Sequence, residues 1–170
     1  MPTKVGLHNA WWLLLTALTV VVDQITKLWT LATFPAVNAS GYYDEIIVTS
    51  FFTLTRRHNT GAAFSFLADS GGWQHYFFVS VAVLVTLWIL WWIWKNPRTM
   101  RWQAVALCLV LGGAIGNTID RVSYGYVVDF LLVHYESWSW PAFNVADMAI
   151  TGGVILMLWD SFFGKHEEPQ

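Results

Sequence analysis

The stretch YFFVSVAVLVTLWILWWIW, from Tyr76 to Trp94, runs for 19 positions without a charged side chain. A helix needs about 20 mostly apolar residues to cross the hydrocarbon core of a bilayer, so this stretch predicts a membrane span. After a short basic link, the stretch WQAVALCLVLGGAIGNTI, from Trp102 to Ile119, gives 18 more uncharged residues. Two such stretches in succession predict an all-α membrane protein.

The composition of the chain supports this interpretation. Of 170 residues, 56% are hydrophobic and 12% are charged, against about 25% charged in an ordinary soluble domain. The 12 tryptophans fit a membrane protein, because indole rings gather at the membrane interfaces. The formal net charge of −2 provides no basic surface for a polyanion, so we expect no nucleic-acid partner.

Two further spans are long enough only if they carry charge into the membrane. Ala10 to Phe34 contains Asp23 and Lys27, and Phe143 to Phe163 contains Asp147 near its start. The first is not a cleavable signal peptide, because its apolar stretch reaches Asp23 without a small-residue cleavage site. We therefore expect one domain with four transmembrane helices at about residues 10–34, 73–95, 101–120 and 143–163.

The distribution of basic residues predicts the orientation. Basic residues favour the cytoplasmic side of a membrane, and one side of this chain has few acids to dilute them. The basic residues of that side are Lys4, Lys95, Arg98, Arg101 and Lys165. We expect both termini to be cytoplasmic and the loops at about 35–72 and 121–142 to be extracytoplasmic. The β-branched and aromatic stretch Ile46 to Thr55 predicts short paired strands, hence a small extracytoplasmic β-sheet.

Charged side chains at membrane depth are costly, at about 2.5 to 3.5 kcal/mol each, and so need partners or a function. Asp23 and Lys27 are four residues apart, which predicts an internal ion pair on one helix face. Asp120 and Arg121 end the third predicted span. Asn117 shares a helix face with Asp120 and is placed to orient a neighbouring group, whereas Arg121 fits an interfacial anchor and a site residue equally well.

Two further acids stand out because neither has an evident partner. Asp147 lies in the first turn of the fourth span with Asn144 on the same face; its acid either complements the helix dipole or does chemistry. Asp129 interrupts an apolar segment, from Gly125 to Leu132, that is too short to span and is expected to dip to the interface and return. Two carboxyls brought together there cannot both ionise, which is the condition for activating water against a peptide carbonyl.

Other functional classes fit these residues less well. The histidines are scattered and no His-Glu-x-x-His run occurs, so we expect no metal site. Cys108 lies among apolar residues, and no serine sits in a strained glycine-flanked turn beside Lys27. A proton pathway needs polar groups through the whole membrane, but the acids gather on one side. A noncatalytic assembly subunit packed through glycines remains open; the glycines are Gly112, Gly116, Gly152 and Gly153.

Five ordered blocks along nearly the whole chain resemble the bacterial lipoprotein signal peptidases of the signal peptidase II type. The blocks are Val22 to Lys27, Asn59 to Phe66, Gly112 to Asn117 with Asp120-Arg121, Val127 to Phe130, and Phe143 to Asp147. One departure is Met148, which stands where the family commonly has a serine hydroxyl beside the second aspartate.

The resemblance implies a multi-pass, aspartic endopeptidase of the bacterial cytoplasmic (inner) membrane, working as a monomer at the extracytoplasmic face without a cofactor. It implies a substrate, the prolipoprotein whose cysteine carries a diacylglyceryl group, held in membrane lipid and cut before that cysteine. Asp129 and Asp147 correspond to the catalytic pair. The implied supporting or substrate-binding residues are Asp23, Asn59, Gly61, Asn117, Asp120, Arg121 and Asn144.

Overall fold

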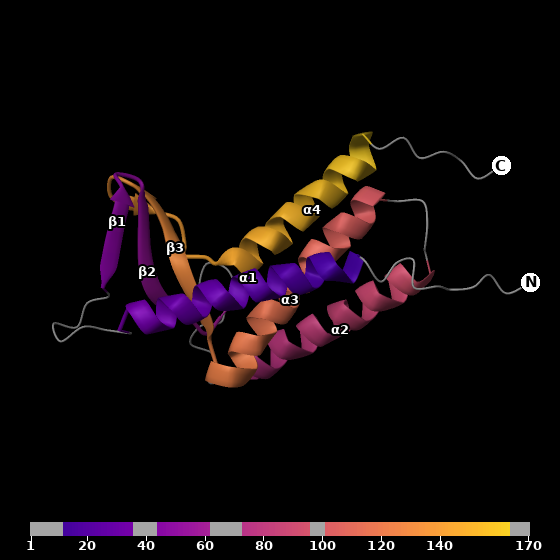
Figure 1. Cartoon of the computed structure of the whole chain (residues 1–170), viewed down its shortest axis with the longest axis horizontal. Coiled ribbons are helices and arrows are strands. Elements are labelled where there is room, and N and C mark those ends of the chain that lie inside the picture. Colours follow the sequence, from indigo (N-terminus) through magenta and orange to yellow (C-terminus); the bar gives the residue numbers. More distant parts are fainter. Residues whose placement is uncertain (1–11, 36–43, 62–72, 96–100, 164–170) are drawn as a thin grey trace, which may run out of the picture.

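The computed structural model describes residues 12–35, 44–61, 73–95 and 101–163. The described residues form four helices, α1 to α4, which lie side by side with a small sheet at one end of them (Figure 1). Each of the four is long and apolar enough to cross a membrane, which agrees with the four predicted spans. Helix α1 begins and helix α4 ends at the end of the bundle away from the sheet (Figure 1).

Helix α1 (Trp12–Thr33) turns a polar stripe inward and an apolar surface outward. Its buried residues recur every three or four positions and so lie on one face. On the other face Leu14, Leu18 and Ile25 are exposed, as expected of side chains that meet lipid. The inward stripe consists of Thr16, Thr19, Asp23, Lys27 and Thr30. Because the polar face of α1 points inward, the charged residues Asp23 and Lys27 lie inside the bundle.

Helix α3 (Arg101–Tyr124) is the central helix and packs against α1, α2 (Trp73–Lys95) and α4 (Val145–Phe163). A Cβ on Gly112 would meet the Thr19 side chain at 2.6 Å, and one on Gly116 would meet the Asp23 carboxylate at 2.5 Å. These glycines therefore let α1 approach closely, as small residues commonly do between membrane helices. An apolar cluster with Ile89, Leu107 and Leu111 joins α2 to the other side of α3.

The sheet has four antiparallel strands in the order β1-β2-β3-β4. Strands β1 (Glu45–Thr49) and β2 (Phe52–Asn59) form the hairpin expected from the sequence. Strand β3 (Val127–Tyr135) pairs with β2 although α2 and α3 separate them in the chain, and the short β4 (Trp138–Ser139) follows it. The chain segment before α2 and the segment after α3 thereby meet in the sheet, at one end of the bundle.

Three expectations need correction. Helix α3 does not end at Asp120 and Arg121 but continues to Tyr124, where Gly125 takes a left-handed φ of 81° and stops it. The segment after Gly125 is strand β3, whose backbone hydrogen bonds are satisfied by pairing with β2, and the chain turns back only after Tyr135, into β4. Helix α4 starts at Val145, since Phe143 is held by backbone hydrogen bonds to Leu131.

The neighbouring glycines of α4 face different surroundings, and this predicts opposite responses to alanine. A Cβ on Gly153 would lie 2.6 Å from the Ala106 carbonyl oxygen on α3, whereas a Cβ on Gly152 meets nothing within 4 Å. We expect Gly153→Ala to lower the unfolding free energy by about 1 to 3 kcal/mol and Gly152→Ala to cause no loss. Thermal unfolding of both variants in detergent is the measurement. Equal losses would contradict this close packing of α3 on α4.

Candidate active site

Asp129 sits on β3, is only 2% exposed, and receives hydrogen bonds from two side-chain amides. Asn59 Nδ2, from the end of β2, donates to Asp129 Oδ2 at 3.0 Å. Asn144 Nδ2 donates to Asp129 Oδ1 at 2.7 Å. The strand pairing explains the first contact, because Asn59 lies opposite Val127 and Arg57 lies opposite Asp129. Both carboxyl oxygens are therefore fixed in direction.

Asp147 stands in the first turn of α4 and forms a reciprocal cap with Asn144. The Asp147 backbone N–H donates to Asn144 Oδ1 at 2.9 Å, and the Asn144 backbone N–H donates to Asp147 Oδ2 at 3.2 Å. This is the geometry of a capping box, and it locks the carboxylate against the helix N-terminus. Asn117 Nδ2 on α3 donates to the other oxygen, Oδ1, at 2.8 Å. Met148 is exposed and leaves none of these bonds unmade.

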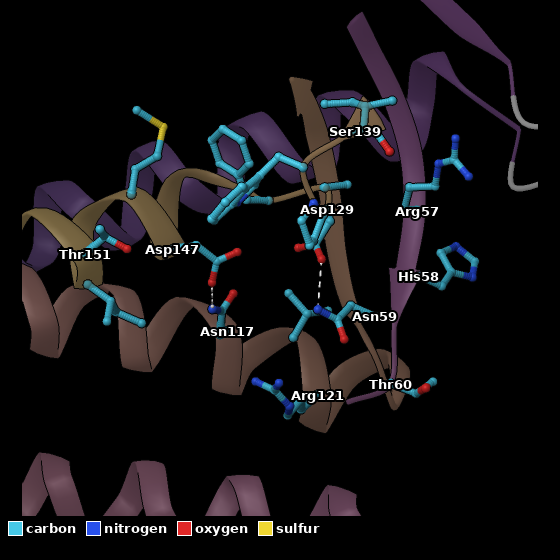
Figure 2. Close-up of a pocket in the computed structure, with 18 of the residues that line it drawn as sticks. Arg57, His58, Asn59, Thr60, Asn117, Arg121, Asp129, Ser139, Asp147 and Thr151 are labelled. Atoms are coloured by element: carbon cyan, nitrogen blue, oxygen red, sulfur yellow. Dashed lines mark hydrogen bonds between the residues drawn. The ribbon is translucent and has the colours of Figure 1, made fainter. Parts of the chain in front are cut away.

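Asn144 brings the two aspartates together. Its backbone N–H contacts Asp147 while its side-chain amide contacts Asp129, so one residue bridges both carboxyl groups. Figure 2 shows the two carboxylates extending from β3 and α4 into one cavity, with Asn59 and Asn117 bonded to them. The pairing expected from the sequence is therefore present in the fold.

The environment of Asp129 favours its protonated form. Burial, together with the charge of Asp147, raises the pKa of Asp129 from its ordinary 3.8 to about 7. The hydrogen bonds from Asn59 and Asn144 and the charge of Lys27 act in the opposite direction and are outweighed. A carboxyl with this pKa holds a proton near neutral pH and can give it up, which a general acid must do.

The remaining predicted site residues divide into two groups around this pair. In the first group, Asn59 Oδ1 accepts the Gly61 N–H at 3.0 Å, and the Gly61 carbonyl accepts from Arg121 at 3.0 Å. Arg121 also lies over the Phe78 ring, so it joins α3 to the end of β2 and to α2. The sequence block from Asn59 to Phe66 is described only through Gly61, because residues 62–66 lie outside the described residues.

Asp23 and Asp120 form the second group, which lies behind the aspartate pair and meets on one lysine. Lys27 Nζ is 2.9 Å from Asp23 Oδ2 and 3.0 Å from Asp120 Oδ2, and all three side chains are buried. This confirms the predicted Asp23–Lys27 ion pair and adds Asp120 to it. Of the residues assigned to the site from the sequence, Asp23, Asp120 and Asn117 all contact Lys27.

The cavity at the pair has a volume of about 1030 Å³ and extends well beyond the predicted residues. One wall follows α4 downward from Asp147, through Met148, Gly152 and Ile155. Met148, Gly152 and Ile155 are four and three residues apart and so lie on one helix face, a periodicity that is visible in the sequence. The opposite rim includes Leu132, Ser139, Trp140, Pro141, Ala142 and Phe143.

Two basic side chains of β2, Arg57 and His58, were also missed from the sequence. Both line the cavity but extend away from the aspartates in Figure 2. His58 stacks on Tyr126 with ring centroids 3.8 Å apart and accepts from Arg56 Nε at 3.1 Å. Burial, aided by the Arg56 charge, lowers the pKa of His58 below its ordinary 6.5. Within the described part of the chain, no group of His, Cys, Asp and Glu is arranged to hold a metal ion.

Comparisons with known proteins agree on one family. The family model described as Signal peptidase (SPase) II matches residues 15–163. The Lipoprotein signal peptidase of Acinetobacter baumannii (strain SDF) is 48% identical over 163 residues, which cover 96% of this chain and 89% of that protein. The protein of the same name from Pseudomonas syringae pv. tomato is 49% identical over 156 residues, covering 91% and 87%. A solved bacterial membrane enzyme has a TM-score of 0.76 at 30% identity, with 95% of both chains covered.

The raised pKa of Asp129 predicts how stability changes with pH. Because the folded chain binds this proton more tightly than the unfolded chain, the contribution of Asp129 is fully present below about pH 4. It is lost as pH rises through about 7, and its full size is on the order of 4 kcal/mol. Asp129→Asn lacks this titration, so its stability relative to wild type should rise between about pH 5 and pH 8. Thermal unfolding in detergent at both pH values tests this; a relative stability that falls over this range would contradict it.

Proposed function

The chain belongs to the signal peptidase II family, and on that premise we propose that it is a membrane-embedded aspartic endopeptidase. We propose that its substrates are prolipoproteins whose cysteine carries a diacylglyceryl group, and that it cuts the peptide bond before that cysteine. The observation that carries the proposal is the pair of aspartates bridged by Asn144 at a cavity wall. Family membership alone makes the chain a peptidase but leaves its catalytic groups unassigned.

The environments of the two aspartates support different roles. We assign the resting proton to Asp129, whose pKa of about 7 favours the neutral form near neutral pH. We assign the negative charge to Asp147, because the first turn of a helix stabilises an anion and Asn117 donates to the carboxylate. Such a pair shares one proton and titrates as a unit.

In the proposed reaction each aspartate gives up one proton and takes up one proton. Asp147 takes a proton from water as the water oxygen bonds to the scissile carbonyl carbon, while Asp129 donates its proton to the carbonyl oxygen. The tetrahedral intermediate then collapses: Asp147 gives its proton to the nitrogen of the cysteine as the C–N bond breaks, and a hydroxyl of the intermediate returns its proton to Asp129 as the new carboxyl group forms. One water is consumed and one proton remains shared, so the pair returns to its starting state.

The position of the pair suits a substrate held in lipid. It lies at the sheet end of the bundle, while Lys95, at the end of α2, belongs to the opposite end. By the distribution of basic residues, we propose that the sheet end is extracytoplasmic and the termini cytoplasmic. Lys4, Arg98 and Lys165, which also support this orientation, lie outside the described residues. We propose that the protein acts as a monomer, since one chain supplies both aspartates.

Replacing either aspartate tests the proposal directly. We expect Asp129→Asn and Asp147→Asn each to lower turnover of a diacylglyceryl prolipoprotein by at least about 1000-fold, because each removes a proton-transfer group. Asp160→Asn is the matched control, since Asp160 is on the same helix but about 20 Å from Asp147 along its axis. The measurement is cleavage by purified protein in detergent. Normal turnover in both site variants would refute the aspartic mechanism and would favour a noncatalytic subunit.

In wild type, the same assay should give a bell-shaped pH dependence. Turnover requires one proton on the pair, so it should fall at low pH, where both carboxyls are protonated, and at high pH, where both are ionised. With the pKa of Asp129 near 7, the high-pH decline is expected around or above neutrality. A rate that keeps rising through about pH 9, two units above that pKa, would contradict the assigned acid.

The α4 wall of the cavity predicts a substrate-size effect at Gly152. Its Cβ position is open and lines the cavity, so Gly152→Leu projects a side chain into the space below the aspartates without a clash inside the protein. We expect its kcat/KM for the lipidated substrate to fall about 10-fold or more at unchanged stability, while Gly152→Ala stays near wild type. Equal activity of the leucine and alanine variants would show that substrate does not pass this face.

A further inference from the structure

We propose that Lys27 is a positioning residue for the aspartate pair, because it ties together the two buried carboxylates that hold the backbone beside each of them. The inference rests on the proposed function, in which Asp129 and Asp147 are the catalytic residues. Lys27 itself is 1% exposed and lies behind the pair, so it does not reach substrate. Its effect is exerted through other residues.

The contacts around the two buried carboxylates follow the same pattern. Asp23 Oδ1 accepts the backbone N–H of Ala146 at 2.8 Å, and Ala146 immediately precedes Asp147. Asp120 Oδ2 accepts the backbone N–H of Val128 at 3.0 Å, and Val128 immediately precedes Asp129. A carboxylate on a helix therefore fixes the main chain one residue before each catalytic aspartate.

Lys27 connects these two supports. Its ammonium group lies 2.9 Å from Asp23 and 3.0 Å from Asp120, so α1 and α3 are held at a set separation at this depth. Since β3 is bonded to Asp120 and the start of α4 is bonded to Asp23, the same separation sets the spacing of Asp129 and Asp147. Deleting the ammonium group leaves two like charges, which repel each other and loosen that spacing.

A third contact of Lys27 orients the amide that contacts Asp147. Lys27 Nζ donates to Asn117 Oδ1 at 2.9 Å, which uses the last of its three donors. With its oxygen toward the ammonium group, Asn117 must turn its nitrogen toward Asp147 Oδ1, 2.8 Å away. Asn144 Nδ2 also contacts Asn117 Oδ1, at 3.3 Å, so the same amide is linked to both sides of the pair. Without Lys27 the opposite flip of Asn117 would place an oxygen against the carboxylate.

The charge of Lys27 also acts on the proton of the pair. The charged groups around it are Asp23 on its own helix, Asp120 and Arg121 on α3, Asp129 on β3 and Asp147 on α4. The Lys27 charge opposes the rise in the pKa of Asp129. Removing it should therefore move the whole pH profile of turnover toward higher pH. A residue that only held the helices together would leave the profile where it is.

The experiment compares Lys27→Met with the double variant Asp23→Asn/Lys27→Met. The double variant keeps the net charge that the cluster has in wild type, and the amide introduced at position 23 still offers an oxygen to the Ala146 N–H. It therefore protects folding without restoring the ammonium group. Thr16→Val is the matched control, because Thr16 is buried on the same helix and bonds the Cys108 carbonyl of α3 at 3.1 Å. Full-length protein in detergent is assayed for kcat, KM, the pH optimum and thermal unfolding.

We expect both Lys27 variants to lose about 100-fold in kcat with KM nearly unchanged. The pH optimum of Lys27→Met should move up by about one unit, while that of the double variant, whose cluster keeps its net charge, should stay near wild type. Thr16→Val should lose stability while keeping wild-type kcat and pH optimum. A folded Lys27 variant with wild-type kcat and optimum overturns the inference, and so does a failure of both variants to fold, which would assign Lys27 to folding alone. If instead Asp129→Asn and Asp147→Asn keep turnover, the proposed function is what fails.

Discussion

The ion cluster of Lys27 with Asp23 and Asp120 is the interaction on which this fold depends. Each ion would cost about 2.5 to 3.5 kcal/mol at membrane depth, so the three are stable only where they satisfy one another. That requirement turns the polar stripe of α1 inward and brings α1 onto α3. Gly116 makes the contact possible, because any side chain there would occupy the place of the Asp23 carboxylate. The glycines of α3 therefore allow close helix packing and also leave space for the Asp23 carboxylate. The buried ion cluster in this way holds α1 against α3.

The sheet is the second constraint, and it works together with the first. Strand β2 precedes the α2–α3 pair and β3 follows it, so their pairing closes a loop that contains half the bundle. Pairing alone would leave β3 free to tilt against the helices. The bond from the Val128 N–H to Asp120 and the backbone bonds between Leu131 and Phe143 attach it to α3 and to the start of α4. Asp129 therefore lies on a strand that is hydrogen-bonded to β2 along one edge and to Phe143 along the other, and that is also bonded to Asp120 of α3.

Features that depend on short spacings could be predicted from local sequence. The four spans follow from hydropathy, the Asp23–Lys27 pair from its i, i+4 spacing, and the placement of Asn144 beside Asp147 from a helix start. The features that were missed depend on contacts distant in sequence. Nothing near Gly125 to Leu132 shows that β2 will pair with it, and nothing near Gln24 shows that its amide will reach Asp120. The role of Asn59 came only from the family resemblance, because its contact with Asp129 spans 70 residues.

On the proposed function, helix α4 connects the catalytic pair to the membrane-spanning part of the protein. Its first turn carries Asp147, and an adjoining face with Met148, Gly152 and Ile155 continues along the cavity wall. With a rise of 1.5 Å per residue, Ile155 lies about 12 Å below Asp147, well inside the length of the span. On the proposed function, a substrate whose apolar part occupies this wall has its depth set by the bilayer, which brings the bond at its polar end to the aspartates. If depth selects the substrate in this way, few side-chain contacts are needed at the bond itself, which is consistent with a cavity of about 1030 Å³ beside a tightly held pair.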